Sequence, residues 1–421
     1  MAARIFDYPG EDLRPAGQPL IFSIDDTISS PPDRYVVVVK RSGNVSTGTP
    51  AEVARFYLTP NANGVAFFDL SPIAESIVTY PLAVGTTPVH QIDDVEFMDG
   101  LCVQRFVVEV GSYNSTTGNV ALNQDSEQIF LIRGTEQISQ GLHPSFDDYL
   151  WGNAKGWLSE RTSVDSIIPG FQLLPLTMRS DEERVISLAA AEDMGRDVTA
   201  PRITFFFVPF SGSPVSYNFS VSFTGITRNR LLQIPIGWAN ISGLQSTYSL
   251  DQIDYISINV QRNSTTVPVG IGDIIELRYD DTKGCRNTAT QVGWINTRGG
   301  WEYLLFTSRA PKQISVEGKN YRKTIGSYND ATFSFNADQS QYETFGKTGK
   351  EQYTLQENFF NAEERGLLDS LMKSNVVQIR RLDESVWKPV NVLTNSLTIQ
   401  PSGSQFYNVS LQVEIAQDLR C

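Results

Sequence analysis

The sequence predicts a mainly β protein, in which two immunoglobulin-like β-sandwich modules precede a β-barrel or open-sheet module with one α-helix. Short runs rich in Val, Ile, Thr, Tyr and Phe recur along the chain and are separated by turns rich in Gly, Pro and Asn. Many of these runs alternate apolar and polar residues, which is typical of half-buried strands. One well-capped amphipathic helix stands out, near the C-terminus.

Composition narrows the classes of function. The 421 residues include 19% charged and 11% aromatic residues and carry a net charge of −13. Proteins that bind nucleic acid by charge are basic, so nucleic acid is not an expected partner. No run approaches the ~20 apolar residues of a membrane span, and the N-terminus lacks a signal-peptide pattern. We therefore expect a chain made in a cytoplasm, without membrane insertion.

The chain length favours several domains. We predict four segments: an N-terminal arm and sandwich over 1–136, an irregular connector or insertion over 137–196, a second sandwich over 197–284, and the C-terminal module over 285–421. Residues 1–16 form the arm, which is interrupted by Pro and Gly.

The first module has strand-like runs on either side of one short helix. Ser71 is the expected N-cap of a helix over Ser71–Val78, with Pro72 at its first position. The predicted strands are Pro19–Ile24, Arg34–Lys40, Ala54–Leu58, Val65–Leu70, Leu101–Val110 and Gln128–Arg133.

The second module shows the same alternation. In the connector before it, Ser180–Val185 is expected to cap a short helix or form a turn. The strands predicted for the module are Arg202–Phe210, Ser216–Phe223, Leu231–Ile236, Ile253–Val260 and Asp273–Tyr279.

The C-terminal module is organised around a hairpin. Strands Thr290–Asn296 and Trp301–Ser308 flank the turn Thr297–Gly300, and large side chains on both faces predict that the hairpin is covered on two sides. A strand over Gln313–Val316 and a turn over Glu317–Asn320 should follow. Asn361 caps the expected helix, Ala362–Lys373, and the remaining predicted strands are Gln352–Leu355, Val376–Arg380, Lys388–Asn391 and Phe406–Ile415.

Nucleophilic and metal chemistry have few candidate residues. The two histidines, His90 and His143, are 53 positions apart, and we interpret them as isolated turn or surface residues. The three cysteines, Cys102, Cys285 and Cys421, are expected to be buried thiols rather than a disulfide framework. No zinc-ligand spacing or phosphate loop is present, and Gly270–Asp273 fits a hairpin turn.

Paired carboxylates are the remaining catalytic candidates. Asp147 and Asp148 lie near Trp151 and Trp157, a combination that glycosidases and saccharide-binding surfaces share, although tryptophans at such spacing are usually core. Three further acidic groups are Asp93-Asp94-Glu96 and, as weak Ca²⁺ candidates, Asp25-Asp26 and Asp280-Asp281. We assign no catalytic, cofactor-binding or metal-binding residue, and we expect no enzyme activity.

Several motifs resemble tailed-bacteriophage virion structural proteins of the tail or baseplate type. Most lie in the C-terminal half, while the front contributes a strand opening at Pro19 and the segment FDLSPI. The connector matches no known motif. The motifs are Cys285, WINTRGGWEY (Trp294–Tyr303), ISVEGKNYRKTIG (Ile314–Gly326), LLDSLMKSNVV (Leu367–Val377), WKPVNV (Trp387–Val392) and YNVSLQVEIAQDLR (Tyr407–Arg420).

The resemblance implies a virion component in the tail, baseplate or tail-tip region. Its expected partners are copies of itself and other virion proteins. The low charge and the neutral Ser, Asn and Gln face of Tyr407–Ile415 add the expectation of a symmetric ring. An adhesin that binds host-surface saccharide is the alternative, and a glycan hydrolase is the third hypothesis.

Overall fold

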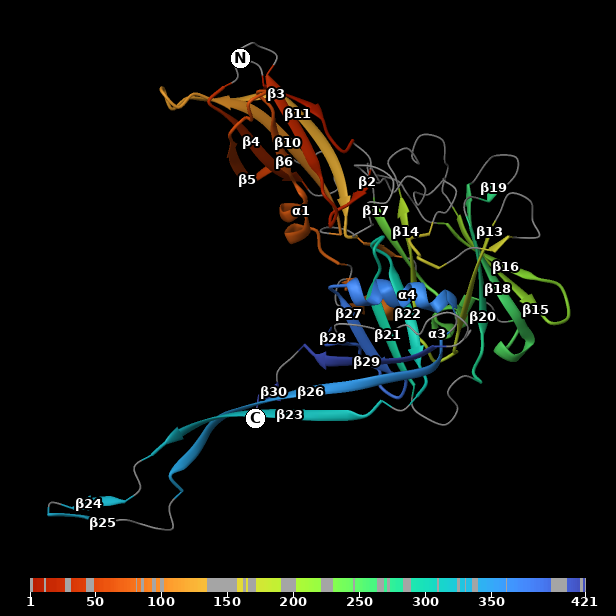
Figure 1. Cartoon of the computed structure of the whole chain (residues 1–421). Coiled ribbons are helices and arrows are strands. Elements are labelled where there is room, and N and C mark those ends of the chain that lie inside the picture. The colour runs from red at the N-terminus through yellow and green to blue at the C-terminus, as the bar shows by residue number, and fades with distance from the viewer. Residues whose placement is uncertain are drawn as a thin grey trace. The chain divides into compact units, whose positions relative to one another are not determined.

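The protein is mainly β, as the sequence predicts, and Figure 1 shows its strands in a computed structural model. Contacts divide the chain into two units: unit 1 is Met1–Lys283, Trp294–Tyr303 and Gly366–Ser374, and unit 2 is Gly284–Gly293, Leu304–Arg365 and Asn375–Cys421. The residues that the structure describes are 3–10, 13–26, 32–42, 49–80, 82–84, 87–92, 96–98, 102–134, 157–161, 164–165, 172–190, 202–220, 230–244, 247–262, 269–270, 273–282, 289–308, 310–323, 326–329, 331–334, 340–360, 362–394, 407–416 and 419–420.

Unit 1 contains a first sandwich built from two sheets. The three-stranded sheet consists of β1 (Ala3–Asp7), β3 (Ile21–Asp26) and β6 (Ala66–Asp69). The five-stranded sheet has the order β2 (Leu13–Pro15), β11 (Val120–Ile132), β10 (Val103–Tyr113), β4 (Arg34–Ser42) and β5 (Ala51–Leu58). Phe22 and Ile24 of the small sheet share one apolar core with Val37, Phe106 and Val108 of the large one.

The expected irregular arm is wrong, because residues 3–7 and 13–15 are strands. Ala3 and Ile5 are buried while Arg4 and Phe6 are exposed, and β1 pairs antiparallel with β3. Arg4 also forms two hydrogen bonds to Asp25, of 2.7 and 3.0 Å. The prolines and glycines that suggested an arm lie between these strands or at their ends.

The helix of the first module is α1 (Ser71–Ile77), and its N-cap is Leu70, so the predicted Ser71 cap is wrong. The backbone N–H of Ser71 instead donates to Asp69 Oδ1, at 2.9 Å. The same oxygen accepts from Leu20 N, at 3.0 Å, which ties the helix start to the residue that precedes β3. The short elements that follow are β7 (Ala83–Val84), β8 (Thr87–Pro88) and the 3-10 turn η1 (Val89–Gln91).

Tyr35, a core residue of this sandwich, supports a prediction of pH dependence. Its side chain is buried, its hydroxyl donates to Gly64 O at 2.6 Å, and burial, the largest cause, raises its pKa to about 12. An unfolded tyrosine titrates near ~10, so the unfolded chain loses this proton first and the folded state becomes less stable as the pH rises from about 10 to about 12. Below about pH 10 this titration has no effect on stability.

Urea unfolding measured from pH 8 upward checks the predicted fall in stability at high pH. The Tyr35→Phe variant should lose about 1 kcal/mol at pH 8, where the lost hydrogen bond to Gly64 dominates. Its stability should then fall less steeply than that of the wild type between about pH 10 and 12. Equal slopes for the two proteins would contradict the assignment to Tyr35.

Unit 1 also contains the second sandwich. Its seven-stranded sheet comprises β12 (Val164–Asp165), β13 (Gln172–Met178), β20 (Ile274–Tyr279), β18 (Ile253–Arg262), β15 (Arg202–Pro209) and β16 (Val215–Ser220), with β19 (Val269–Gly270) paired to β18. The facing sheet is β14 (Val185–Ala190), β17 (Arg230–Pro235) and β9 (Glu96–Met98). Leu176, Phe205 and Ile256 of the first sheet pack with Leu188 and Leu232 of the second.

Part of the segment expected to be an irregular connector belongs to these sheets. β13 pairs in parallel with β20, about a hundred positions later, and β14 pairs antiparallel with β17. Ser180–Val185 includes the turn between β13 and β14, where Glu182 N donates to Arg179 O at 3.3 Å. The predicted turn Gly270–Asp273 lies partly outside the described residues. The remaining short elements are α3 (Trp238–Ile241), η3 (Ser242–Leu244) and η4 (Leu250–Gln252).

Most of unit 2 belongs to a large sheet. Its order is β22 (Trp301–Phe306), β21 (Thr290–Ile295), β27 (Val377–Arg381), β28 (Lys388–Val392), β29 (Tyr407–Ile415), β26 (Tyr342–Phe360) and β23 (Lys312–Arg322), with β30 (Leu419–Arg420) paired to β26 and a small hairpin β24 (Ser327–Asn329) and β25 (Thr332–Ser334). β21 and β22 are almost completely buried, which confirms the hairpin that is covered on two sides.

The predicted turn Glu317–Asn320 is wrong, because β23 continues through it. Its ladder with β26 shifts register between Gly318 and Lys319. The extra residue lies in β26, where Gly346 has φ 64° and absorbs the bulge, so β23 itself stays extended.

The predicted helix is confirmed as α4 (Ala362–Lys373). Leu367, Leu368 and Leu371 are buried, and Ser370 Oγ accepts a 3.1 Å hydrogen bond from Trp294 Nε1. Asn361, its expected cap, lies outside the described residues. None of the helices in the described ranges has the length and apolar character that a membrane crossing requires.

Candidate functional site

The turn between β21 and β22 is the best-organised polar site in the described part of the chain. Asn296 closes it: its N–H donates to Gly300 O at 2.8 Å, and its Oδ1 accepts from Arg298 N and Gly300 N at 3.0 and 2.9 Å. Gly299 has φ 81°, a conformation that a residue with a Cβ rarely adopts. An asparagine side chain that mimics the backbone therefore fixes a turn that its glycines allow.

A segment far away in sequence, Trp157–Arg161, holds this turn; we call it the clamp. Leu158 O accepts from Asn296 Nδ2 at 2.7 Å, and Glu160 Oε1 accepts from Thr297 N at 2.8 Å. Arg298 Nη1 also donates to the carbonyl of Ser159. The clamp is itself anchored to the second sandwich, since Trp157 Nε1 donates to Asp273 O at 2.6 Å.

Glu302 extends the same network along β22. It is 3% exposed, and its Oε1 accepts from Ser159 Oγ at 2.5 Å and from Glu160 N at 2.9 Å. Arg161 Nε lies 3.4 Å from Glu302 Oε2 and its Nη2 donates to Tyr303 O at 3.0 Å. A buried carboxylate with a cation and two neutral donors has the partners that offset its desolvation.

Tyr303 joins β22 to His90 of η1. Its hydroxyl accepts from Val185 N at 3.2 Å and lies 2.7 Å from His90 Nδ1. A hydroxyl can donate one hydrogen bond and accept two, so it can pair with Nδ1 of either imidazole tautomer while it accepts from Val185. Burial raises the pKa of Tyr303 well above its usual value, so this hydroxyl stays protonated.

A second buried ion pair lies beside Tyr303. Arg184 Nη2 and Glu182 Oε2 are 2.5 Å apart, and their side chains are 4% and 1% exposed. Glu182 Oε1 accepts from Arg179 N at 2.7 Å, and the guanidinium lies 5.7 Å from the centre of the Tyr303 ring. Arg184 Nη1 finds no acceptor among the described residues.

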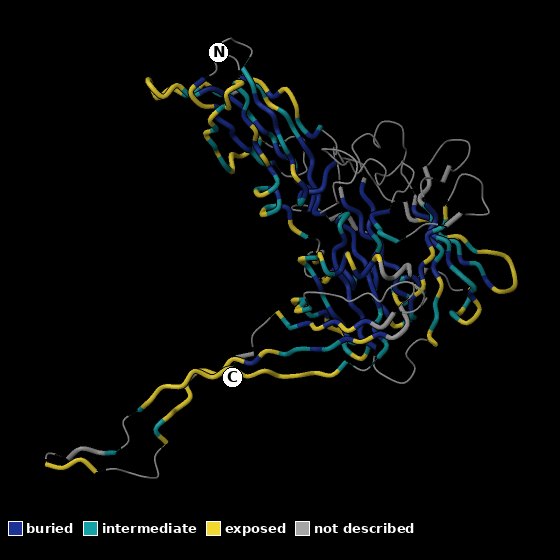
Figure 2. Tube along the Cα trace, in the orientation of Figure 1, coloured by how far each residue is buried: buried dark blue, intermediate teal, exposed yellow. Residues whose placement is uncertain are grey.

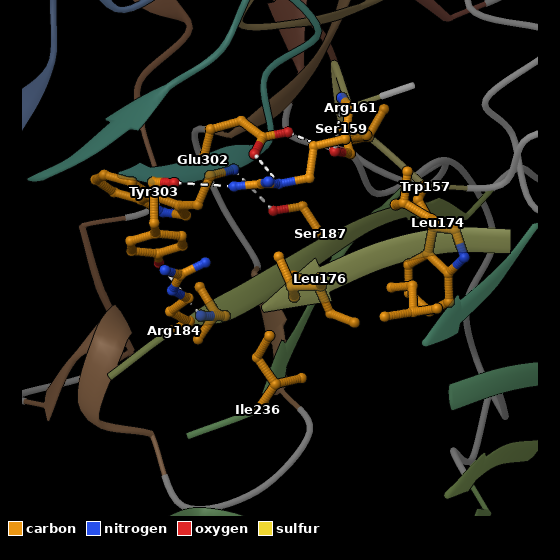
Figure 3. A pocket seen from close by; sticks show the side chains of 15 residues that line it. Trp157, Ser159, Arg161, Leu174, Leu176, Arg184, Ser187, Ile236, Glu302 and Tyr303 are labelled. Atoms are coloured by element: carbon orange, nitrogen blue, oxygen red, sulfur yellow. Dashed lines mark hydrogen bonds and ion pairs between the residues drawn. The ribbon is translucent and has the colours of Figure 1, made fainter. Parts of the chain in front are cut away.

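These groups surround a small cavity. Figure 3 shows Trp157 and Leu174 at one end and Tyr303 with Arg184 at the other, while Glu302 points toward Ser159 and Arg161. The cavity volume is about 30 Å³, which has room for a water molecule or two. Bound water would give Arg184 Nη1 the acceptor it lacks.

The clamp, the β21–β22 turn, Glu302 and Tyr303 together form a buried polar network that fits a structural role. Every carboxylate in it already accepts hydrogen bonds from the chain's own donors, and Ser187 Oγ donates to Gln233 Oε1 at 3.0 Å while accepting from Trp301 N at 3.1 Å. These hydrogen bonds hold residues 294–303 in one position.

The structure places the candidate residues of the sequence in different environments. His90 is fully buried against Trp301 and Tyr303, so its interpretation as an isolated turn or surface residue is wrong. Trp157 is core, 3% exposed. Cys102 is buried. His143, Asp147, Asp148, Trp151, Asp93, Asp94, Cys285 and Cys421 lie outside the described residues, as does the side chain of Glu96.

The two weak Ca²⁺ candidates serve local hydrogen bonding. Asp25 is bound by Arg4, Asp280 accepts from Thr282 N at 2.9 Å, and Asp281 accepts from Ser180 N at 2.7 Å. Within the described ranges, no group of three or more His, Cys, Asp or Glu side chains could hold a metal ion.

Sequence reasoning missed the clamp and its partners. The signal for Glu302 was present, because an acidic residue between Trp301 and Tyr303 in a strand covered on both faces must find a buried partner. Nothing in the sequence pointed to Arg161 or to Glu182 and Arg184, which lie more than a hundred positions from the hairpin.

The fold and the site together define a multi-sheet β protein with a buried polar network. No family model matches the chain, and no curated protein matches it. Among solved structures, the two tandem V-type regions of the v-region-containing chitin-binding protein VCBP3 align over 66% of this chain and 98% of that one, with 9% identity and a TM-score of 0.15. The BSP domain of a biofilm-associated protein aligns over 84% and 63%, with 9% identity and a TM-score of 0.13. Likenesses this weak carry no argument.

Proposed function

We propose that the protein is a non-enzymatic structural component of a tailed-bacteriophage virion, in the tail, baseplate or tail-tip region, and that several copies assemble into a symmetric ring. The sequence motifs described above support the assignment to a virion, and the buried polar network around Glu302 suits a component that must hold its shape. The structural basis for the proposed ring contact is one exposed face of unit 2.

That face is formed by β26 and β29 and is polar but almost neutral. The register places Gln356 opposite Ser410 and Thr354 opposite Gln412. Ser410, Gln412 and Gln356 are exposed, whereas Val409, Leu411 and Val413 on the other face of β29 are buried.

The one acidic group at the end of this face, Glu414, is an ionised carboxylate that is already paired with a cation. It accepts from Lys350 Nζ and Gln352 Nε2, each at 3.0 Å, and these donors lower its pKa. Neutral polar side chains cost less to desolvate than Lys or Glu, which protein interfaces avoid at their centres. A repeated contact of this kind closes into a ring when its rotation divides a full turn, and a stable one buries roughly 800 Å² per partner or more.

Charging this face tests the proposal. The double variant Ser410→Lys with Gln412→Glu should fold normally, as judged by circular dichroism and thermal unfolding, but fail to enter particles in a complementation assay. The physical reason is that the contact would have to desolvate both introduced charges.

A matched control makes the same two substitutions elsewhere. Ser216→Lys in β16 with Gln172→Glu in β13 changes exposed residues of unit 1, and this variant should enter particles normally. Normal incorporation of the Ser410 variant would overturn the ring contact. Binding of the isolated protein to a glycan array would favour the adhesin instead, and release of reducing sugar from host envelope would overturn the non-enzymatic assignment.

A further inference from the structure

β23 is a long, open sheet edge within unit 2. It is the last strand of its sheet, it pairs with β26 on one side, and the described residues supply no strand on the other. All eleven of its residues are exposed, and Figure 2 draws this strand in the colour of exposed residues. Ile314 and Val316 are each 55% exposed. Such an edge is a template for pairing with another strand.

The direction of its free backbone groups follows from two hydrogen bonds at its ends. Thr354 N donates to Pro311 O at 3.2 Å, and Lys323 N donates to Gln341 O at 2.9 Å. Odd-numbered residues therefore direct their backbone groups toward β26, and because these directions alternate along a strand, even-numbered residues direct theirs to the open edge. Ile314, Val316 and Gly318 are among the latter.

This alternation restricts how two copies of β23 can pair antiparallel. Even-numbered residues of one copy must face even-numbered residues of the other, because only these direct their backbone groups to the open edge. The two-fold axis therefore passes through one residue position and not between two. An axis at Glu317 would place two glutamates directly opposite, and an axis at Lys319 would place two lysines opposite, both of which are unfavourable. An axis at Gly318 places Glu317 opposite Lys319 of the partner subunit, twice by symmetry.

We propose that β23 pairs antiparallel with β23 of a second copy of this chain, about a two-fold axis at Gly318. Outward-directed residues from Ile314 to Arg322 all find partners in this register. The side chains of Glu317 and Lys319 form no hydrogen bond or ion pair with the described residues, so both charges are free to form the reciprocal pairs. This pairing does not depend on the proposed virion function, because it is an isologous contact separate from the β26–β29 face.

The pairing would also add strands to the two-stranded ribbon that β23 forms with β26. β30 pairs with β26 only at Thr348 and Gly349. Residues 342–347 of β26 therefore have β23 as their one described partner strand. An isolated two-stranded ribbon is marginally stable in water, whereas a second copy converts this one into a four-stranded sheet.

Charge reversal in the full-length chain tests the register, with sedimentation equilibrium as the measurement. The single variants Glu317→Lys and Lys319→Glu each place like charges opposite across the axis and should weaken dimerisation by about tenfold. The double variant, Glu317→Lys with Lys319→Glu, exchanges the signs and should restore the wild-type dissociation constant.

Val316→Pro is a second, independent test. The substitution removes an N–H that points to the open edge and leaves the ladder to β26 intact, so the variant should keep the wild-type circular dichroism but remain monomeric. A wild-type chain that stays monomeric across a concentration series would overturn the proposal, as would a proline variant that dimerises. Failure of the double variant to recover would overturn the Gly318 register, and particle incorporation of the Ser410 variant bears only on the ring.

Discussion

Arg184→Met is expected to lower the free energy of unfolding by about 3–5 kcal/mol, because it leaves Glu182 buried without its cation. The two side chains are 4% and 1% exposed and 2.5 Å apart, so bulk solvent cannot replace the lost cation. Guanidinium chloride unfolding of the purified chain measures the effect, followed by the fluorescence of the buried tryptophans.

A double-mutant cycle separates the ion pair from general packing. Glu182→Met with Arg184→Met removes both charges and should recover most of the loss, since a buried pair replaced by apolar residues of similar volume is often neutral. Arg381→Met is the exposed control: its bridge to Asp383 is 37% and 49% exposed, and the change should cost at most about 1 kcal/mol. Equal losses for the single and double variants would contradict the account of this pair.

Gly299→Ala should cost about 3 kcal/mol or more. The residue has φ 81°, and an added Cβ would lie 2.0 Å from Arg133 O, so conformational strain and a collision with backbone act together. The same unfolding experiment measures it.

Gly118→Ala is the matched control for Gly299→Ala. Gly118 has φ 67°, but nothing lies within 4 Å of an added Cβ, so only the strain remains and the loss should be about 1–2 kcal/mol. A loss at Gly299 no larger than that at Gly118 would mean that the hairpin turn is not held tightly against residue 133.

The elements that the sequence predicted well are those whose pattern is local. α4 has the predicted bounds because its apolar stripe of Leu367, Leu368 and Leu371 lies within one helix. β29 alternates buried Val409, Leu411 and Val413 with polar residues, and the β21–β22 turn is marked by its two glycines. Each signal needs no knowledge of the partner strand.

The elements that it missed depend on partners far along the chain. β2 is three residues long and pairs in parallel with β11, and β13 pairs in parallel with β20, so these partner strands lie about a hundred positions away in the sequence. The turn-like text Glu317–Asn320 was misleading, because the residue that absorbs the irregularity, Gly346, lies in the other strand of the ribbon.

The buried polar network was missed for the same reason. Ser159 and Arg161 reach Glu302 across about 140 positions of sequence, and no spacing rule connects them. What the sequence could indicate is narrower: an acidic side chain within an otherwise apolar hairpin requires a buried partner, of unknown identity.

Immunogold labelling of purified particles with an antibody against this chain tests the central claim most directly. We expect gold at the tail, concentrated at the baseplate or tail tip, on particles that carry the wild-type chain. Particles that contain no label while the antibody detects the chain free in the same lysate would contradict a structural role in the virion.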